Sequence, residues 1–145
     1  MFNVRVYGLL QYDNKILLAD EFIKGMEITK FPGGGLEFGE GTIDCLKREF
    51  LEELNQPIED IRHFYTTDFF QVSAFNPKHQ IISIYYLVKP SKTIQFKTKN
   101  KIFDFDVRKN NACAFRWVHE KELSADMLTL PIDKMVANLY VKKHL

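Results

Sequence analysis

The feature that most restricts the fold of this chain is a glycine-rich segment that leads directly into an acidic helical pattern. Five of the seven glycines fall within residues 33–41. Glycine allows a backbone to come very close to a ligand or to another backbone. Apolar residues then recur at helical spacing from Thr42, a good capping residue, to Leu54, where Asn55 and Pro57 end the pattern. The sequence therefore predicts a loop, a helix and a second loop.

Three glutamates share one side of this predicted helix. At 100° per residue, Glu49, Glu52 and Glu53 fall within an arc of about 100°. Glu49 and Glu53 are like charges one turn apart, which costs helix stability, and Arg48 can neutralise only Glu52 among them. Excess carboxylate oxygens select a hard cation, so the pattern indicates Mg²⁺ or Mn²⁺. A solvated acidic face is the competing interpretation.

The spacing of loop and helix resembles the Nudix box, the signature of the Nudix hydrolases, between Gly34 and Gln56. Seven of its nine defined positions match, namely Gly34, Glu40, Arg48, Glu49, Phe50, Glu52 and Glu53. The two departures lie at the end of the helix, where the family has glycine and then an apolar residue, and this chain has Asn55 and Gln56. Asparagine replaces glycine well in a left-handed cap. Ile58 is available to fill the apolar position.

The resemblance implies an α+β fold, the Nudix α/β/α sandwich, with a mixed central sheet, a catalytic loop-helix-loop and a C-terminal helix. It also implies divalent-metal-dependent hydrolysis of a phosphoanhydride in a nucleoside triphosphate, ADP-ribose or a nucleotide sugar. The metal ligands implied are Glu49, Glu52 and Glu53, and the catalytic residues are Glu49, Arg48 and Glu40. Gly34 and Gly35 are the predicted substrate-binding positions, since their backbone can approach a ligand closely.

Two questions about the chemistry stay open at this point. The general base is Glu49 or a later acid, and the acids available are Glu120, Glu122, Asp126, Asp104 and Asp106. The second question is whether the domain turns its nucleotide over or only senses it, as regulatory relatives do. Those relatives usually lose glutamates from the box. All four are present here, which favours catalysis.

The rest of the chain reads as one α+β domain over residues 1–145. The β-branched and aromatic pattern predicts strands over residues 3–10, 15–20, 61–70, 80–88 and 114–118, the first two forming a hairpin. Residues 92–111 are polar and basic without a clear period, which predicts strand and loop. A terminal helix is predicted over residues 131–143.

Composition limits the partners and the location. The formal net charge of +1 gives no argument for nucleic acid, and no apolar stretch is long enough for a membrane span or a signal peptide, so we expect a cytoplasmic enzyme. Cys45 and Cys113 have no zinc-like spacing and are expected to be buried, inert thiols. The aromatic-rich residues 64–75 leave a homodimer open.

Overall fold

The computed structural model describes residues 1–144, and the chain divides into two compact units. The first unit contains residues 1–10 and 32–96, and the second contains residues 11–31 together with the described residues from 97 onward. The chain passes from one unit to the other near the end of its first strand. Every position of the predicted box, from Gly34 to Gln56, belongs to the first unit.

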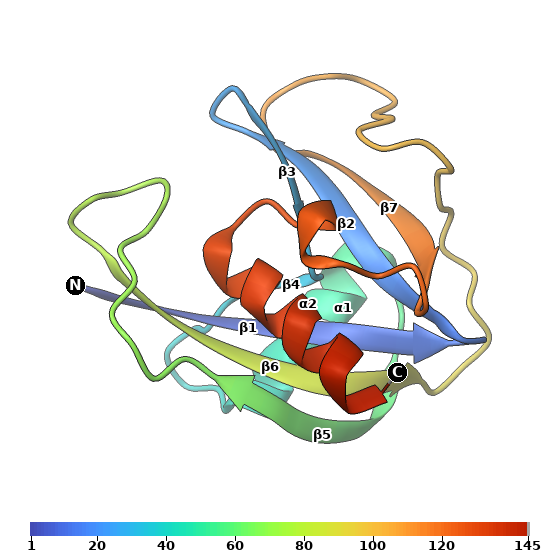
Figure 1. Ribbon diagram of the computed structural model, residues 1–145, viewed down its shortest axis with the longest axis horizontal. Helices are drawn as coiled ribbons and strands as arrows, with labels where there is room; N and C mark the ends of the chain where they lie inside the picture. The colour runs from blue at the N-terminus through green and yellow to red at the C-terminus, as the bar shows by residue number, and fades with distance from the viewer. Residues whose placement is uncertain (145) are drawn as a thin grey trace. The chain divides into compact units, whose positions relative to one another are not determined.

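Four strands form the mixed sheet of the first unit. They are β1 (Phe2–Tyr12), β4 (Gly33–Gly35), β5 (Ile58–Thr66) and β6 (Gln80–Pro90). Strands β1 and β6 run parallel from Phe2 opposite Gln80 to Leu10 opposite Val88. Strand β4 pairs with β1 and β5 with β6, both antiparallel, so β1, β6 and β5 lie side by side (Figure 1). Residues 6–10 of β1 are all buried, as in strands covered on both faces.

Helix α1 (Thr42–Leu54) packs its apolar side on this sheet at the point where β1 has a glycine. A β-carbon at Gly8 would lie 2.9 Å from Phe50 Cε1 and 3.4 Å from Leu46 Cδ1, so the absent side chain lets the helix approach. Asn55 ends the helix in the left-handed conformation, as predicted. The predicted cap at Thr42 is wrong. Gly41 is the capping residue, because the Thr42 hydroxyl lies 2.6 Å from the Tyr86 hydroxyl instead.

The second unit is built around β2. Its strands are β2 (Lys15–Ile23), β3 (Met26–Lys30) and β7 (Ala112–His119), and β2 pairs antiparallel with both of the others. Asp13 and Asn14 take positive φ angles in the turn before β2, as a hairpin requires. The hairpin predicted between residues 3–10 and 15–20 is nevertheless wrong in its pairing, because only Gln11 and Tyr12 pair with β2 while residues 2–10 pair with β6. A 3₁₀ helix, η1 (Ala125–Met127), and helix α2 (Pro131–His144) complete the unit. The terminal helix is therefore confirmed.

A buried ion pair ties the strands of the second unit together. Asp20 is fully buried and accepts hydrogen bonds from Arg116 Nε at 2.6 Å and from the Thr29 hydroxyl at 2.7 Å. The Phe103 backbone N–H donates at 3.1 Å to Asp20 Oδ2, the oxygen that also accepts from Arg116 Nε. One carboxylate thus joins β2, β3, β7 and the segment after β6. Such a group must stay fully paired, since an unpaired buried charge is very unfavourable.

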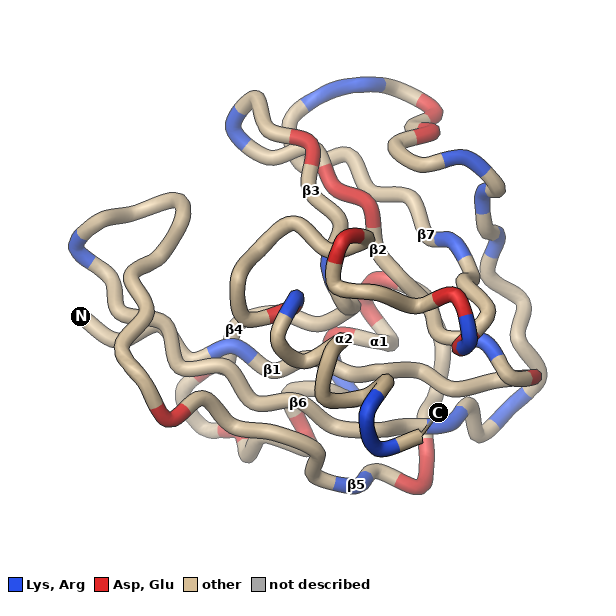
Figure 2. The backbone as a smooth tube through the Cα atoms, viewed as in Figure 1, with Lys and Arg blue, Asp and Glu red and all other residues tan. Residues whose placement is uncertain are grey.

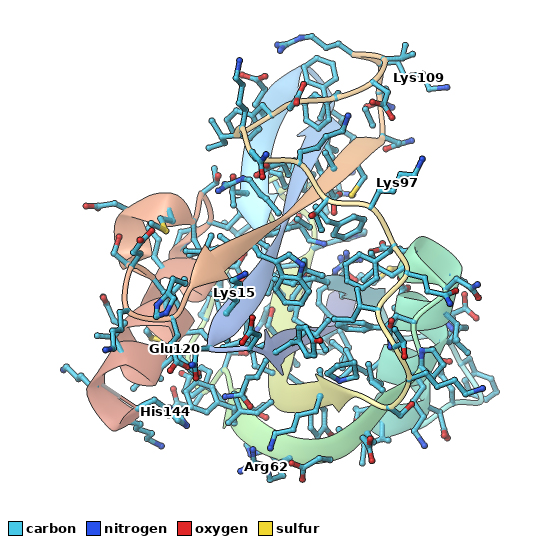
Figure 3. The ribbon with its side chains drawn as sticks, turned by 90° about the vertical axis from the view of Figure 1, so that its right-hand side faces the viewer. Lys15, Arg62, Lys97, Lys109, Glu120 and His144 are labelled. Atoms are coloured by element: carbon cyan, nitrogen blue, oxygen red, sulfur yellow. The ribbon has the colours of Figure 1, made fainter. Side chains whose placement is uncertain are left out.

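Residues 92–111 contain no strand, so the strand part of the prediction for this range was wrong. Within it, residues 97–111 of the second unit form a long irregular segment. The segment mixes Lys and Arg with two aspartates (Figure 2). The side chains of Lys97 and Lys109 project outward from it (Figure 3). Lys99 Nζ pairs with Asp106 at 2.6 Å, and the Lys99 N–H donates to Phe115 O at 2.7 Å. The segment is ordered by these bonds rather than by sheet pairing.

The described helices also bear on the membrane prediction. Among residues 1–144, no helix combines the length and the apolar character that crossing a bilayer requires. The observed arrangement is an α+β chain with a mixed sheet and two helices, one of them C-terminal, as the sequence predicted. The single domain over residues 1–145 stays a prediction.

Candidate active site

Arg48 is the centre of the candidate site, because its guanidinium contacts several acids of the loop and the helix. Arg48 Nε donates to Glu40 Oε2 at 2.9 Å, and Nη2 donates to Glu40 Oε1 at 2.7 Å. Nη2 also donates to Gly35 O at 3.1 Å. The hydrogen bond from Arg48 holds the pKa of the Glu40 carboxyl at about 2, well below its usual range. The same pair raises the pKa of Arg48. The loop is thereby fastened to the helix.

Glu49 lies under the glycine loop and is the best shielded of the helix acids. Its side chain is 13% exposed, and its Oε1 accepts a hydrogen bond from Arg48 Nη1 at 3.1 Å. A β-carbon at Gly34 would lie 2.5 Å from Glu49 Cδ and 2.7 Å from Oε2. Any larger residue at position 34 would therefore displace this carboxylate. Gly34 has a structural reason to be glycine that differs from the predicted contact with substrate.

The remaining acids of the cluster are more exposed. Glu52 lies one turn after Arg48, as predicted, with its Oε2 3.3 Å from Nη1 and its side chain 58% exposed. Glu37, which sequence reasoning did not single out, lies 3.7 Å from the same nitrogen. Glu53 is exposed on the last turn of α1. Arg48 thus faces Glu37, Glu40, Glu49 and Glu52, and one positive charge among four carboxylates leaves a strongly negative surface.

The oxygen ligands on this surface are of the kind that bind a divalent cation. Carboxylate oxygens are what Mg²⁺ and Mn²⁺ prefer, and Glu49, Glu52 and Glu53 are on one helix. Within residues 1–144, however, no three His, Cys, Asp or Glu side chains converge on one point suited to a metal ion. Arg48 explains this arrangement, since it draws carboxylates of the cluster toward its own nitrogens. The donor types fit, and a cation would have to compete with Arg48 for Glu49 and Glu52.

The acids that follow the box are the other candidates for the general base. Glu120 accepts a hydrogen bond from the Tyr140 hydroxyl at 3.2 Å, and Asp106 pairs with Lys99. These contacts do not single out a general base among the later acids, so its identity stays open.

Cys45 is buried, and burial raises its pKa to about 12, as an inert thiol requires. Cys113 is exposed, so the expectation that it is buried was wrong, because it lies near the start of β7, where the strand is not yet covered.

Gln56 is the residue whose role the sequence left unexplained. Its side chain is 2% exposed, and Nε2 donates to Pro57 O at 2.8 Å and to Lys92 O at 3.1 Å. The amide thus joins the end of α1 to the segment after β6. A buried polar residue beside a chain reversal is a recognisable signal for such a contact, although its partners lie too far along the chain to be read from the sequence.

Comparison with known proteins decides the family. The sequence model of the NUDIX domain matches residues 1–139. The chain belongs to the Nudix family. No curated protein matches it. Its membership makes it a Nudix pyrophosphohydrolase, and enzymes of this family act on small nucleoside diphosphate derivatives, generally with divalent metals.

Solved structures share the Nudix fold at low sequence identity. A NUDIX hydrolase from Nitrosomonas europaea is 21% identical, with a TM-score of 0.72 over 99% of this chain and 90% of that chain. A MutT NUDIX hydrolase from Burkholderia pseudomallei is 17% identical, with a TM-score of 0.65 over 96% and 98%. A protein described as a UDP-X diphosphatase is 17% identical, with a TM-score of 0.64 over 100% of this chain and 65% of its own. These similarities bear on the fold alone.

Proposed function

We propose that this Nudix protein hydrolyses a phosphoanhydride in a nucleoside diphosphate linked to another moiety, with Mg²⁺ or Mn²⁺ as its cofactor. The observation that carries the proposal is the set of box carboxylates gathered around Arg48 on one loop and one helix. The substrates that share this bond are nucleoside triphosphates, ADP-ribose and nucleotide sugars. A small-molecule substrate, rather than nucleic acid, also agrees with a net charge of +1.

Each side chain of the site has a separate role in this proposal. Glu49, Glu52 and Glu53 would hold the cation, which supplies charge neutralisation at the phosphates and a more acidic water. Glu40 and Arg48 keep the loop on the helix, so that Gly34 and Gly35 face the substrate with little bulk. Glu49 is the acid placed to accept a proton from water, since its side chain is shielded and held in position.

The first test measures phosphate and nucleotide release from a panel of nucleoside diphosphate derivatives with Mg²⁺ or Mn²⁺. Wild type is compared with Glu53→Gln, and Glu59→Gln serves as control because Glu59 is an exposed acid outside the box. We expect metal-dependent turnover that collapses only in Glu53→Gln. Calorimetric titration with Mn²⁺ gives a readout that does not depend on turnover, and its affinity should fall in the same variant.

A non-catalytic nucleotide sensor is the alternative function. It would bind Mn²⁺ and nucleotide but release no product from any member of the panel. The four box glutamates at positions 40, 49, 52 and 53 favour catalysis, because a sensor has no need of an acidic helix that disfavours its own folding. Tight nucleotide binding without turnover would replace the hydrolase proposal with this one.

We further propose that both compact units act as one domain, which is supported by a family match that spans residues 1–139 and so includes parts of both. Limited proteolysis at rising temperature tests this, since the two units of one domain should become open to cleavage in a single cooperative transition.

A cytoplasmic location also stays a prediction, to be tested by cell fractionation.

A homodimer stays a prediction as well, and an exposed apolar patch in the first unit supports it. Phe2 is 67% exposed, Phe70 is 71% exposed and Val72 is 39% exposed. Phe2 and Val72 both lie opposite Gln80, so these two side chains share one face of the sheet, and Phe70 lies two residues before Val72 along the chain. Exposed apolar patches often mark interaction surfaces. Light scattering should give twice the chain mass for wild type and the chain mass for Phe70→Ser, whereas a monomeric wild type contradicts the prediction.

A further inference from the structure

A polar cavity opens where the box helix ends. It measures about 520 Å³ and is lined by Asn55, Pro57, Lys92, Thr93 and Gln95, all in the first unit. One wall is the turn that follows α1, where Asn55 takes φ 51° and ψ 36°. The other wall is the segment that follows β6. None of these residues belongs to the predicted site.

The two walls are joined by the residue that departs from the family pattern. Gln56 Nε2 bridges Pro57 O and Lys92 O, and the Ser91 N–H donates to Pro57 O at 3.1 Å. An apolar residue at position 56 would remove the donor to Lys92 O, whereas Pro57 O would keep its bond from the Ser91 N–H. Because an unmet buried hydrogen-bonding group is unfavourable, the buried amide fixes the distance between the walls. The cavity is therefore part of the folded structure of this chain and not a gap between loose loops.

The lining selects a particular chemistry. It offers two amides, from Asn55 and Gln95, one hydroxyl from Thr93 and one ammonium group from Lys92. Pro57 is the one apolar residue among those that line it, and no aromatic ring is among them, so a nucleobase would find no stacking surface. Amides and hydroxyls both donate and accept hydrogen bonds, as the hydroxyl groups of a sugar do. A hydroxyl-rich group matches the two amides and the hydroxyl, and the Lys92 ammonium can donate to its oxygens.

The cavity also adjoins the helix that carries the proposed metal ligands. Asn55 is the cap directly after α1, two residues beyond Glu53 and three beyond Glu52. A pyrophosphate held at Glu49, Glu52 and Glu53 could therefore place the group on its far phosphate in the cavity. We propose that this cavity binds the sugar of a nucleoside diphosphate sugar, and so selects nucleotide sugars among the substrates of the proposed function, on which this inference rests.

A binding experiment without metal tests the site independently of turnover. ¹⁵N-labelled protein in EDTA is titrated with UDP-glucose and, separately, with UDP, which lacks the sugar. We expect UDP-glucose alone to shift the amide signals of Asn55, Thr93 and Gln95. Equal shifts with both ligands, or no shift at these three residues, would overturn the assignment.

A kinetic experiment then separates this inference from the proposed function. Thr93→Val removes one hydroxyl from the cavity, and Thr98→Val makes the same change at an exposed position outside it. Thr93→Val should raise KM for UDP-glucose about 3- to 10-fold while KM for UTP changes less than about twofold. An equal effect on both substrates, or none, contradicts the sugar site while leaving the hydrolase standing. If no substrate is turned over, the proposed function fails, and the titration alone decides about the cavity.

Gln56→Leu restores the apolar residue of the family and tests how the cavity is held open. We expect it to lose the preference for UDP-glucose over UTP because Lys92 O is released. If this variant folds, as judged by its circular dichroism, and keeps the preference, the amide bridge is not what shapes the site. Thr93→Val keeps the proposal testable if Gln56→Leu does not fold.

Discussion

Arg48 holds Glu40 through two parallel hydrogen bonds, from Nε at 2.9 Å and from Nη2 at 2.7 Å. This planar fork matches a carboxylate in a way that a lysine ammonium cannot. Arg48→Lys should therefore free the loop from the helix and lower kcat about 10- to 100-fold, since small misplacements of reacting groups are costly. Steady-state kinetics measure the effect.

The control for this change is Lys47→Gln, which alters the neighbouring exposed charge. It should leave kcat within about twofold of wild type, because exposed charges contribute little to a site that they do not contact. If both variants lose activity equally, the general charge of α1 matters rather than the fork between Arg48 and Glu40.

The same pair predicts how stability depends on pH. Arg48 lowers the pKa of Glu40 from 4.5 to about 2, so the ionised carboxyl is favoured in the folded state. Its stabilising effect is complete above pH 4.5 and is lost as the pH falls toward about 2. The Tm of wild type should exceed that of Glu40→Gln by a constant amount above pH 4.5, and the two should converge in acid. A difference that grows in acid would show that the sign is wrong.

Gly34→Ala should disturb Glu49 directly. The added methyl group would lie 2.5 Å from Glu49 Cδ, so the carboxylate must move away from its place under the loop. Because the contact is with the end of a flexible side chain, the free energy of unfolding should change by less than about 1 kcal/mol. The matched control is Gly35→Ala, whose β-carbon would meet only the mobile end of Arg5, at 3.1 Å. Mn²⁺ titration should separate the two variants because only Gly34→Ala displaces Glu49, whereas urea denaturation should find them similar in stability.

This comparison also tests the substrate-binding role predicted for both glycines. If they only provide space for substrate, Gly34→Ala and Gly35→Ala should raise KM alike and leave Mn²⁺ affinity unchanged. A loss of metal affinity confined to Gly34→Ala would assign position 34 to the support of Glu49.

The sequence predicts the end of the site helix well because this end depends on local chemistry. Asn55 and Pro57 end the helix, and spacing along one helix places Arg48 near Glu52, so both could be read without the fold. Contacts that link distant segments could not. The hydrogen bond between Gln56 and Lys92 spans 36 positions, and nothing in either local pattern indicates the other.

The strands show the same division between local and distant determinants. The turn at Asp13 and Asn14 was predictable from its residues, yet most of β1 pairs in parallel with β6. An alternating or buried pattern shows that a segment is a strand but not which partner it chooses. Strands β3 and β4 escaped prediction because one is five residues long and the other consists of three glycines, which are poor strand formers.

The buried pair of Asp20 and Arg116 gives the sharpest prediction about stability. Asp20 is fully buried and takes two hydrogen bonds from Arg116, so Arg116→Met would leave a charged carboxylate with only the Thr29 hydroxyl and the Phe103 N–H. Removing one partner of a buried pair costs roughly 3–5 kcal/mol. Urea denaturation should show this loss in the free energy of unfolding.

Arg108→Met provides the matched control, because Arg108 pairs with Glu27 at a position where its side chain is 58% exposed. Water already solvates that pair, so its loss should cost less than about 1 kcal/mol. The substitution is identical and both arginines pair with an acid of the second unit, so the contrast reports burial together with the number of hydrogen bonds lost. Arg108 also lies over the Phe22 ring, at 4.6 Å from its centre, and this contact is lost in the control. Equal losses would mean that Asp20 finds other solvation when Arg116 is absent, and that the carboxylate does not hold β2, β3 and β7 together as the structure indicates.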